Sequence, residues 1–386
     1  MNARLDGRAR VLDAFGASSG VKAELLSYDP GERSESAISS SIRFPLADET
    51  FVDTWREYSQ RASAMGFPAL AEQLVQLRFP VEEGISQTDE YRAVTRRGAS
   101  ADEMASTTGL RFVHPERCSV IIHPTWAGSI PIIQTSCRED FVSLVQAFTA
   151  RNEPVFVPPS QGACIVAGYN NWDRVRRFRH RWMMEQPTVP FSLSFLSGHT
   201  DEYQDRFLLL GNGPYSGVPA ERLGLSCSEW QDLSLTIRRE HECAHYWTRR
   251  VFSSMKNRIV DELLADYCGL VGACGRLRAD WLLTFLGIDN PPTCREDGRL
   301  HNYRGNPPLS DEAFEVLQRV TLAAVENLAT FDRSAAAELS GRRGLLLILL
   351  TLSRMSLEDM AGGEAQTLLL TALRDGRTLA SRAGQR

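Results

Sequence analysis

The stretch that decides the fold of this chain is residues 240–267, which read EHECAHYWTRRVFSSMKNRIVDELLADY. Within it His241 and His245 are four residues apart, and Glu262 and Asp266 have the same spacing. Residues four apart lie on one face of an α-helix, so the two side chains of each pair are expected to project side by side. The stretch therefore predicts two consecutive helices, one presenting two imidazoles and the other two carboxylates.

Helix-forming signals surround the first pair. Ser226-Cys-Ser-Glu229 matches a capping box, in which a hydroxyl and a carboxylate satisfy the free amides of a helix start. The helix that it opens is expected to run to about Phe252, with apolar residues at positions 230, 233, 237, 244 and 252 facing the interior. Imidazoles on that side need a partner, because an unpaired polar group in an apolar interior is costly.

The second helix must fold back on the first for the two pairs to meet. The segment from Ser253 to Arg258 is a loop short enough to allow this. Two neutral imidazoles and one carboxylate, from His241, His245 and Glu262, leave a fourth position for water, as catalytic zinc requires. We therefore expect a zinc site with these three ligands.

Two acidic residues beside the ligands have different expected roles. Glu242 is rotated about 100° from His241 around the helix axis, which places it next to the metal without making it a ligand. Asp266 shares a face with Glu262 and is placed to accept a proton from the far ring nitrogen of a ligand histidine. Such a bond would fix the tautomer of that histidine.

The same stretch carries a family resemblance. His241-Glu-Cys-Ala-His245 followed by Glu262-Leu-Leu-Ala-Asp266 resembles the HExxH…ExxxD pattern of the gluzincin metallopeptidases. The resemblance spans Glu240 to Tyr267. It implies that Glu242 is the general base and acid, that zinc sits on the three predicted ligands, and that Asp266 supports His241. It also implies peptide-bond hydrolysis and an edge strand, at 206–211, that pairs with a bound peptide.

The implied reaction needs a group that stabilises the oxyanion. Three downstream side chains are candidates for this role: His301, Tyr303 and Tyr267. The alternative for each of them is a surface or packing role.

Other interpretations of the motif remain open. Glu242-x-x-His245 is also typical of carboxylate-bridged di-iron proteins, but that fold needs a second ExxH on another helix, and the sequence has none. A non-catalytic binding or regulatory protein with a structural zinc, or none, would have no use for a base at position 242. A further alternative is that His241 and His245 are core histidines and that the two carboxylates lie on a solvated helix face. It does not explain why four ionisable groups converge beside apolar stripes, where unpaired charge is costly.

Periodicity along the chain favours a mixed α+β protein in three parts. Residues 1–104 are expected to be a loop-rich N-terminal extension with two helices, within 51–66 and 68–77. Residues 105–300 would form a zincin-like catalytic core with a small mixed sheet and the active-site helix, and residues 301–386 a C-terminal helical lobe. Strands are expected at 119–123, 129–135, 154–158, 163–169 and 206–211, and further helices at 139–152, 259–287, 310–331, 343–356 and 363–374.

Composition limits the partners. The 386 residues carry a net charge of -5, which argues against a nucleic-acid or membrane-surface partner and leaves a peptide or protein substrate. The arginine-rich segment 173–181 is therefore interpreted as a solvated helix. The N-terminus has no apolar stretch of signal-peptide length, and the longest apolar run, Leu345 to Leu350, is too short to span a bilayer. We expect a cytoplasmic protein with reduced cysteines.

Overall fold

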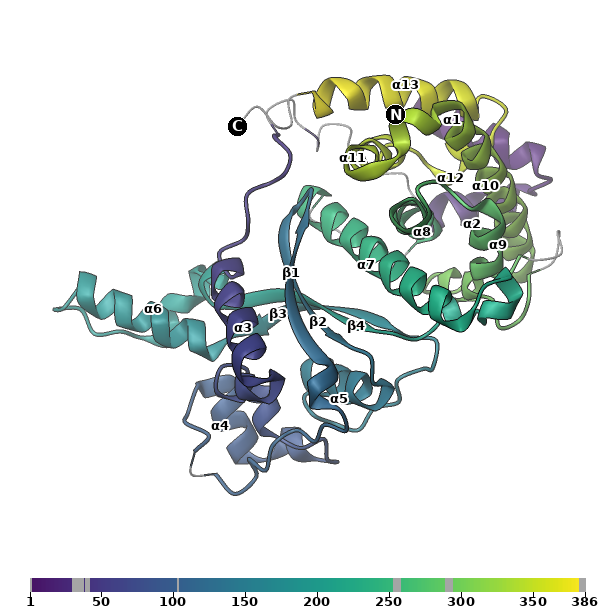
Figure 1. Cartoon of the computed structure of the whole chain (residues 1–386). Helices are drawn as coiled ribbons and strands as arrows, with labels where there is room; N and C mark the ends of the chain where they lie inside the picture. Colours follow the sequence, from purple (N-terminus) through teal and green to yellow (C-terminus); the bar gives the residue numbers. More distant parts are fainter. Residues whose placement is uncertain are drawn as a thin grey trace. The chain divides into compact units, whose positions relative to one another are not determined.

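The computed structural model describes residues 2–29, 38, 42–102, 104–252, 258–288 and 294–381. Over these residues the chain is mixed α+β, with one four-stranded sheet and many helices, which confirms that part of the predicted fold class (Figure 1). It divides into two compact units: a sheet unit, residues 47–217, and a helical unit, residues 1–46 with 218–386. The predicted boundaries near 104 and 300 do not coincide with these units. The N-terminal residues pack within the helical unit, where Arg8 forms a buried ion pair with Glu358 (2.9 Å).

The sheet unit contains four strands in the order β1-β2-β4-β3. β1 and β2 form an antiparallel hairpin, β2 and β4 are parallel, and β3 and β4 are antiparallel, so the sheet is mixed as predicted. β4 lies between β2 and β3, and the expectation that the strand at 206–211 lies at an edge is wrong. The run from Phe207 to Leu210 is fully buried, which is typical of an inner strand covered on both faces. The strands are β1 (Cys118–Thr125), β2 (Gly128–Thr135), β3 (Ala163–Asn170) and β4 (Gln204–Gly211).

The strand predicted at 154–158 is absent from the described sheet, and this prediction is wrong. Pro154 and Pro158 have no N–H to donate to a ladder, and the side chain of Phe156 between them is 82% exposed. The carbonyl groups of this segment are instead bound by Arg138, whose Nη2 donates to Val157 O (3.1 Å) and Pro158 O (2.7 Å).

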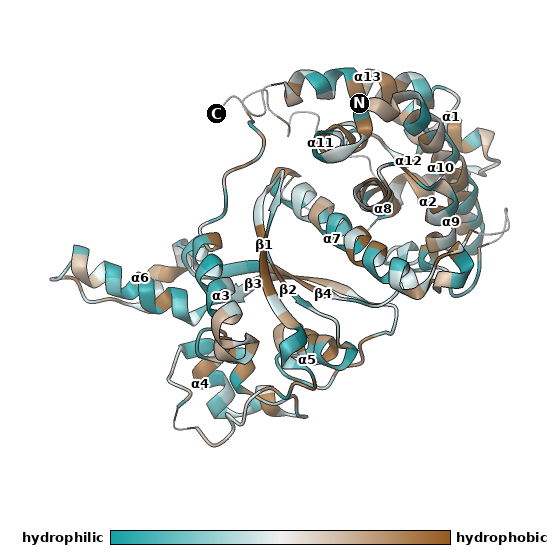
Figure 2. Cartoon of the chain, viewed as in Figure 1, coloured by the Kyte–Doolittle hydropathy of each residue, from teal (hydrophilic) through white to brown (hydrophobic). Residues whose placement is uncertain are grey.

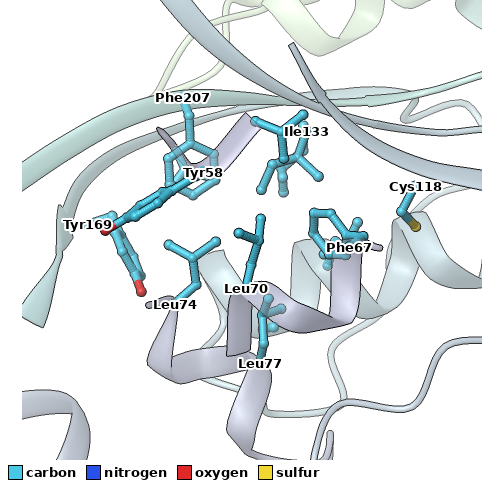
Figure 3. Close-up of a cluster of buried hydrophobic side chains, with 14 of the residues drawn as sticks. Tyr58, Phe67, Leu70, Leu74, Leu77, Cys118, Ile133, Tyr169 and Phe207 are labelled. Carbon is cyan, nitrogen blue, oxygen red and sulfur yellow. The ribbon is translucent and has the colours of Figure 1, made fainter. Parts of the chain in front are cut away.

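One apolar cluster joins the sheet to helices α3 (Val52–Met65) and α5 (Arg138–Thr149), which confirms the helices expected in 51–66 and 139–152. Figure 3 shows side chains of the sheet, among them Ile133 and Phe207, facing leucines that follow α3. Leu70 and Leu77 lie in two short 3-10 helices, Phe67–Glu72 and Val75–Arg78, and Leu74 lies between them, where an α-helix was predicted over 68–77.

Two further helices of the sheet unit are polar. α4 (Asp89–Arg97), a short helix capped by the Thr88 side chain, lies in the region expected to be loop-rich and is additional to the two helices predicted there. α6 (Trp172–Glu185) carries the arginine-rich segment and is coloured largely hydrophilic in Figure 2, in agreement with the solvated helix expected at 173–181. Its exposed Arg181 pairs with Glu202 at 2.7 Å.

The helical unit begins with α1 and α2, in a region expected to be loop, and continues after residue 218 with seven further described α-helices. The helix predicted over 259–287 is two helices, because Gly275 ends the first with a φ of +73°. No described helix is long and apolar enough to cross a membrane. The helices are α1 (Asn2–Ala14), α2 (Ser19–Tyr28), α7 (Cys227–Phe252), α8 (Ile259–Cys274), α9 (Ala279–Leu286), α10 (Asp311–Leu339), α11 (Gly341–Leu352), α12 (Leu357–Ala361) and α13 (Ala365–Ala380).

The capping box and the fold-back of the second helix are both confirmed. Glu229 N donates to Ser226 Oγ (3.3 Å), and Ser226 N donates to the Glu229 carboxylate (3.1 Å). Helix α8 packs closely on α7 because it has glycines at the contact. A Cβ added to Gly269 would lie 2.7 Å from the carbonyl oxygen of Ile237, so a larger residue does not fit.

Candidate metal centre

Helices α7 and α8 bring the three predicted ligands together. His241 Nε2 and His245 Nε2 are 3.0 Å apart. Glu262 Oε2 lies 3.5 Å from His241 Nε2, and Glu262 Oε1 lies 3.4 Å from His245 Nε2. All three residues are buried, and they form the one group of three or more possible ligands found in the part of the chain that the structure describes.

The spacing of these atoms suits a small tetrahedral cation. Zinc binds imidazole nitrogen and carboxylate oxygen at about 2.0–2.2 Å, so two ligand atoms on a tetrahedron are about 3.3–3.6 Å apart. The separations of 3.0, 3.4 and 3.5 Å are close to that edge length. Three such donors fit zinc and leave one tetrahedral position for water or substrate.

Asp266 fixes the orientation of His241, as the sequence spacing predicted. Its Oδ1 lies 2.9 Å from His241 Nδ1, and its Oδ2 accepts a hydrogen bond from Arg299. Burial raises the pKa of Asp266, but the charge of Arg299 and the bond to His241 outweigh it, and the pKa is lowered overall. The ionised carboxylate keeps the proton on His241 Nδ1, so the lone pair of Nε2 faces the other ligands.

The electrostatics of the cluster favour a cation. Burial raises the pKa of Glu262, but its hydrogen bond and charge interactions with His245, with help from His241 and Arg299, hold that pKa well below its usual range. Burial lowers the pKa of His245, yet the hydrogen bond to Glu262 and the negative charges of Glu262 and Glu242 raise it overall. The carboxylates therefore produce a negative potential at the imidazoles, which attracts a proton or a metal ion.

The second ring nitrogen of His245 is also informative. Nδ1 is buried and has no hydrogen-bond partner among the described residues. Leaving a buried donor unpaired costs about 1–3 kcal/mol. Nε2 of the same ring points at His241 and Glu262, so Nε2 is the nitrogen of this ring that is placed to bind a cation together with them.

Glu242 lies on the next position of the same helix turn. Its side chain is half-buried, in contrast to the buried ligands on either side of it in the sequence. Its negative charge contributes to the raised pKa of His245. The helix geometry therefore leaves Glu242 beside the ligands, where the sequence predicted a general base.

The three oxyanion candidates have different surroundings. The Tyr303 hydroxyl donates to Glu262 Oε2 at 2.7 Å, so this side chain reaches the cluster through a ligand. The centroid of the His301 ring lies 4.8 Å from that of Phe314, and among the described residues no hydrogen bond or ion pair joins His301 to the ligands. The Tyr267 hydroxyl donates to Asp332 at 2.8 Å and not to any of the three candidate ligands.

Two residues of the site were missed by the sequence analysis. Arg299 binds Asp266, and Tyr28 holds the backbone of Tyr303 through a hydrogen bond of 2.7 Å. Neither has a spacing that relates it to the motif, since Tyr28 lies 275 residues before its partner. Only the closeness of Arg299 to the candidates at 301 and 303 could have drawn attention to it.

The fold and the site define a mixed α+β protein with a buried cluster of two histidines and one glutamate on a helix pair. The chain belongs to the DUF7005 family, a family of unknown function, whose model matches residues 10–364. The matched region includes all three ligands together with Glu242, Asp266 and Arg299. Neither a curated protein nor a solved structure matches the chain.

Proposed function

We propose that this protein is a zinc-dependent hydrolase that acts as a metallopeptidase on a peptide or another amide bond. The proposal is carried by one observation, the convergence of His241, His245 and Glu262 on one buried point. The HExxH…ExxxD pattern supports zinc as the metal, a zincin-like arrangement of the core and amide hydrolysis as the reaction.

The residues of the chain have distinct parts in this reaction. Zinc held by the three ligands would act as a Lewis acid that makes water nucleophilic near neutral pH. The Glu242 carboxylate takes the proton from the attacking water and passes it to the leaving amine nitrogen. Asp266 keeps His241 in the tautomer that offers Nε2, and Tyr303 holds one oxygen of Glu262.

The alternatives fit the site less well. A di-iron centre draws four carboxylates and two histidines from its helices, whereas the cluster found among the described residues has one carboxylate. A purely structural zinc site is closed by four protein ligands. A set of three with a half-buried glutamate beside it favours catalysis.

Metal analysis of three variants tests the proposal. The wild type and Glu242→Gln are expected to contain one zinc per chain, and His245→Ala none, because only the last change removes a ligand. Cleavage of a peptide library is expected in the wild type and should fall by at least 100-fold in Glu242→Gln, since general acid–base catalysis contributes about 10²–10⁴-fold.

Glu240→Gln is the matched control, because it makes the same chemical change on the same helix. The Glu240 side chain packs toward Gly272 rather than toward the ligands, so zinc content and cleavage should stay at the wild-type level. Two iron ions per chain, or zinc retained in His245→Ala, would overturn the assignment of the site. Zinc binding with undiminished cleavage in Glu242→Gln would overturn the role of the base.

A further inference from the structure

We propose that Tyr28 is a positioning residue of the metal centre, and that helix α2 is thereby an integral part of the site. This inference rests on the proposed function, because it concerns the same three ligands. It assigns a role to the N-terminal residues, which the sequence motif leaves unexplained.

The first step is the bond between Tyr303 and Glu262. The hydroxyl of Tyr303 donates to Oε2 of Glu262 at 2.7 Å, and the same carboxylate approaches both histidines through its two oxygens. A hydrogen bond from outside the ligand set fixes the orientation of the carboxylate. The position of Tyr303 therefore controls how Glu262 is presented to a metal.

Tyr303 is in turn held in place by a contact from helix α2. This residue ends a short 3-10 helix, Arg299–Tyr303, whose few internal bonds do not fix its position. The Tyr28 hydroxyl donates to the carbonyl oxygen of Tyr303 at 2.7 Å and accepts a longer bond, 3.4 Å, from Ile259 N. One hydroxyl thus joins the segment that carries Tyr303 to the start of α8, three residues before Glu262.

The backbone that follows Tyr303 packs closely against the ring of Tyr28. Gly305 has a φ of +86°, and a Cβ added there would lie 3.0 Å from Cδ2 of that ring. A side chain at this position would be strained by the backbone and would press on the tyrosine. The glycine lets the chain turn closely around Tyr28, which supports a specific fit of the two segments.

Other side chains near the end of α2 hold the same two segments. The Glu24 carboxylate accepts hydrogen bonds from Ser310 N (2.5 Å) and Ser310 Oγ (2.7 Å), at the residue that caps helix α10. Asp29 pairs with Arg258, directly before α8, at 2.9 Å. Helix α2 therefore clamps both the segment after Tyr303 and the segment before Glu262.

Zinc binding to the metal-free full chain tests the proposal. Affinity is measured by competition with a chromophoric chelator, and the coordination of the site by the visible absorption of its cobalt form. Tyr303→Phe is expected to weaken zinc binding by roughly 10–100-fold, the usual effect of losing a bond to a ligand. Tyr28→Phe keeps the ring and should weaken binding several-fold, with a shift of the cobalt bands in the same direction.

The double variant decides whether Tyr28 acts through Tyr303. If it does, Tyr28→Phe adds little once Tyr303→Phe is present, so the two losses are not multiplicative. The matched control is Tyr267→Phe, which removes a buried hydroxyl from helix α8 that binds Asp332 instead of the cluster. It should lower the melting temperature but leave zinc affinity and the cobalt spectrum unchanged.

The outcomes separate this inference from the proposed function. A wild-type chain that binds no zinc overturns both. Zinc binding by the wild type with unchanged affinity and spectrum in Tyr28→Phe overturns the inference alone, as do fully multiplicative losses in the double variant. An equal loss of affinity in Tyr267→Phe would show that general destabilisation explains the effect, and would also overturn it.

Discussion

The sheet unit and the helical unit each bury a carboxylate network, and the two networks differ in how they are completed. In the sheet unit, Asp205 accepts hydrogen bonds from Arg174 Nη1 (2.6 Å), Asn171 Nδ2 (2.7 Å) and Trp55 Nε1 (2.8 Å). All of its partners are fixed donors of the protein. This network is closed, and it needs nothing from outside the chain.

In the helical unit, atoms that could bind a cation face one another. The two Nε2 atoms of His241 and His245 and the oxygens of Glu262 lie within 4.8 Å, a distance at which a shared cation is the natural partner. The outer residues of the network, Asp266 and Arg299, are paired in the ordinary way. The two networks therefore differ in their inner atoms: those around Asp205 are an acceptor and its fixed donors, whereas those of the helical unit are nitrogens and oxygens that could share a cation.

The largest effect is expected in the closed network. Asp205→Asn removes the negative charge opposite the buried Arg174, and breaking a buried pair by removing one partner costs about 3–5 kcal/mol. The free energy of unfolding, measured with urea, should fall by that amount, and zinc or a chelator should not change the loss. A loss below about 1 kcal/mol would contradict the importance given to this pair.

A smaller effect, which depends on metal, is expected in the network of His241, His245 and Glu262. We call this network open because a cation could complete it. Zinc at one hundred times its dissociation constant should stabilise the wild type by about 2.7 kcal/mol, because it binds the folded state. Calorimetry with and without zinc should show this increase in the wild type and in Glu242→Gln. An equal increase in His245→Ala would mean that zinc binds elsewhere.

The helix contact that supports the open network is expected to respond to a single methyl group. Gly269→Ala places a Cβ against the backbone of Ile237 and should cost about 1–3 kcal/mol, the usual effect of overpacking, together with a loss of zinc affinity. The control is Gly7→Ala in helix α1, where no atom lies within 4 Å of the added Cβ. That change should stabilise the protein by about 0.4–1 kcal/mol, and an equal loss in both variants would contradict the close-contact argument.

The part of the site that lies within two helices could be predicted from the sequence. Spacing of four residues fixes which side chains share a helix face, so the convergence of His241, His245 and Glu262 followed once the second helix folded back on the first. The loop predicted from Ser253 to Arg258 lies, up to residue 257, outside the described residues. A bond from Asp266 to one of the two histidines followed from the same spacing, and the family resemblance implied that this histidine is His241. The capping-box residues Ser226 and Glu229 likewise predicted where α7 begins, and their hydrogen bonds are present in the structure.

The parts that depend on distant contacts could not be predicted in this way. Tyr28 joins the site through a backbone carbonyl, and no side-chain pattern encodes an interaction of that kind. The inner position of β4 depends on which strands pair with it, which the apolar run alone does not determine. The strand predicted at 154–158 had the composition of a strand, but its prolines prevent pairing.

The order of the two units along the chain has a consequence for synthesis. Residues 47–217 form an uninterrupted unit, whereas the helical unit needs residues from both ends of the chain. The sheet unit is therefore synthesised whole before His241 is reached, while α1 and α2 wait for helices that are translated after that unit. The three candidate ligands and the clamp at Tyr28 can therefore come together only after the sheet unit has been made, and a metal that needs this site would bind after that point.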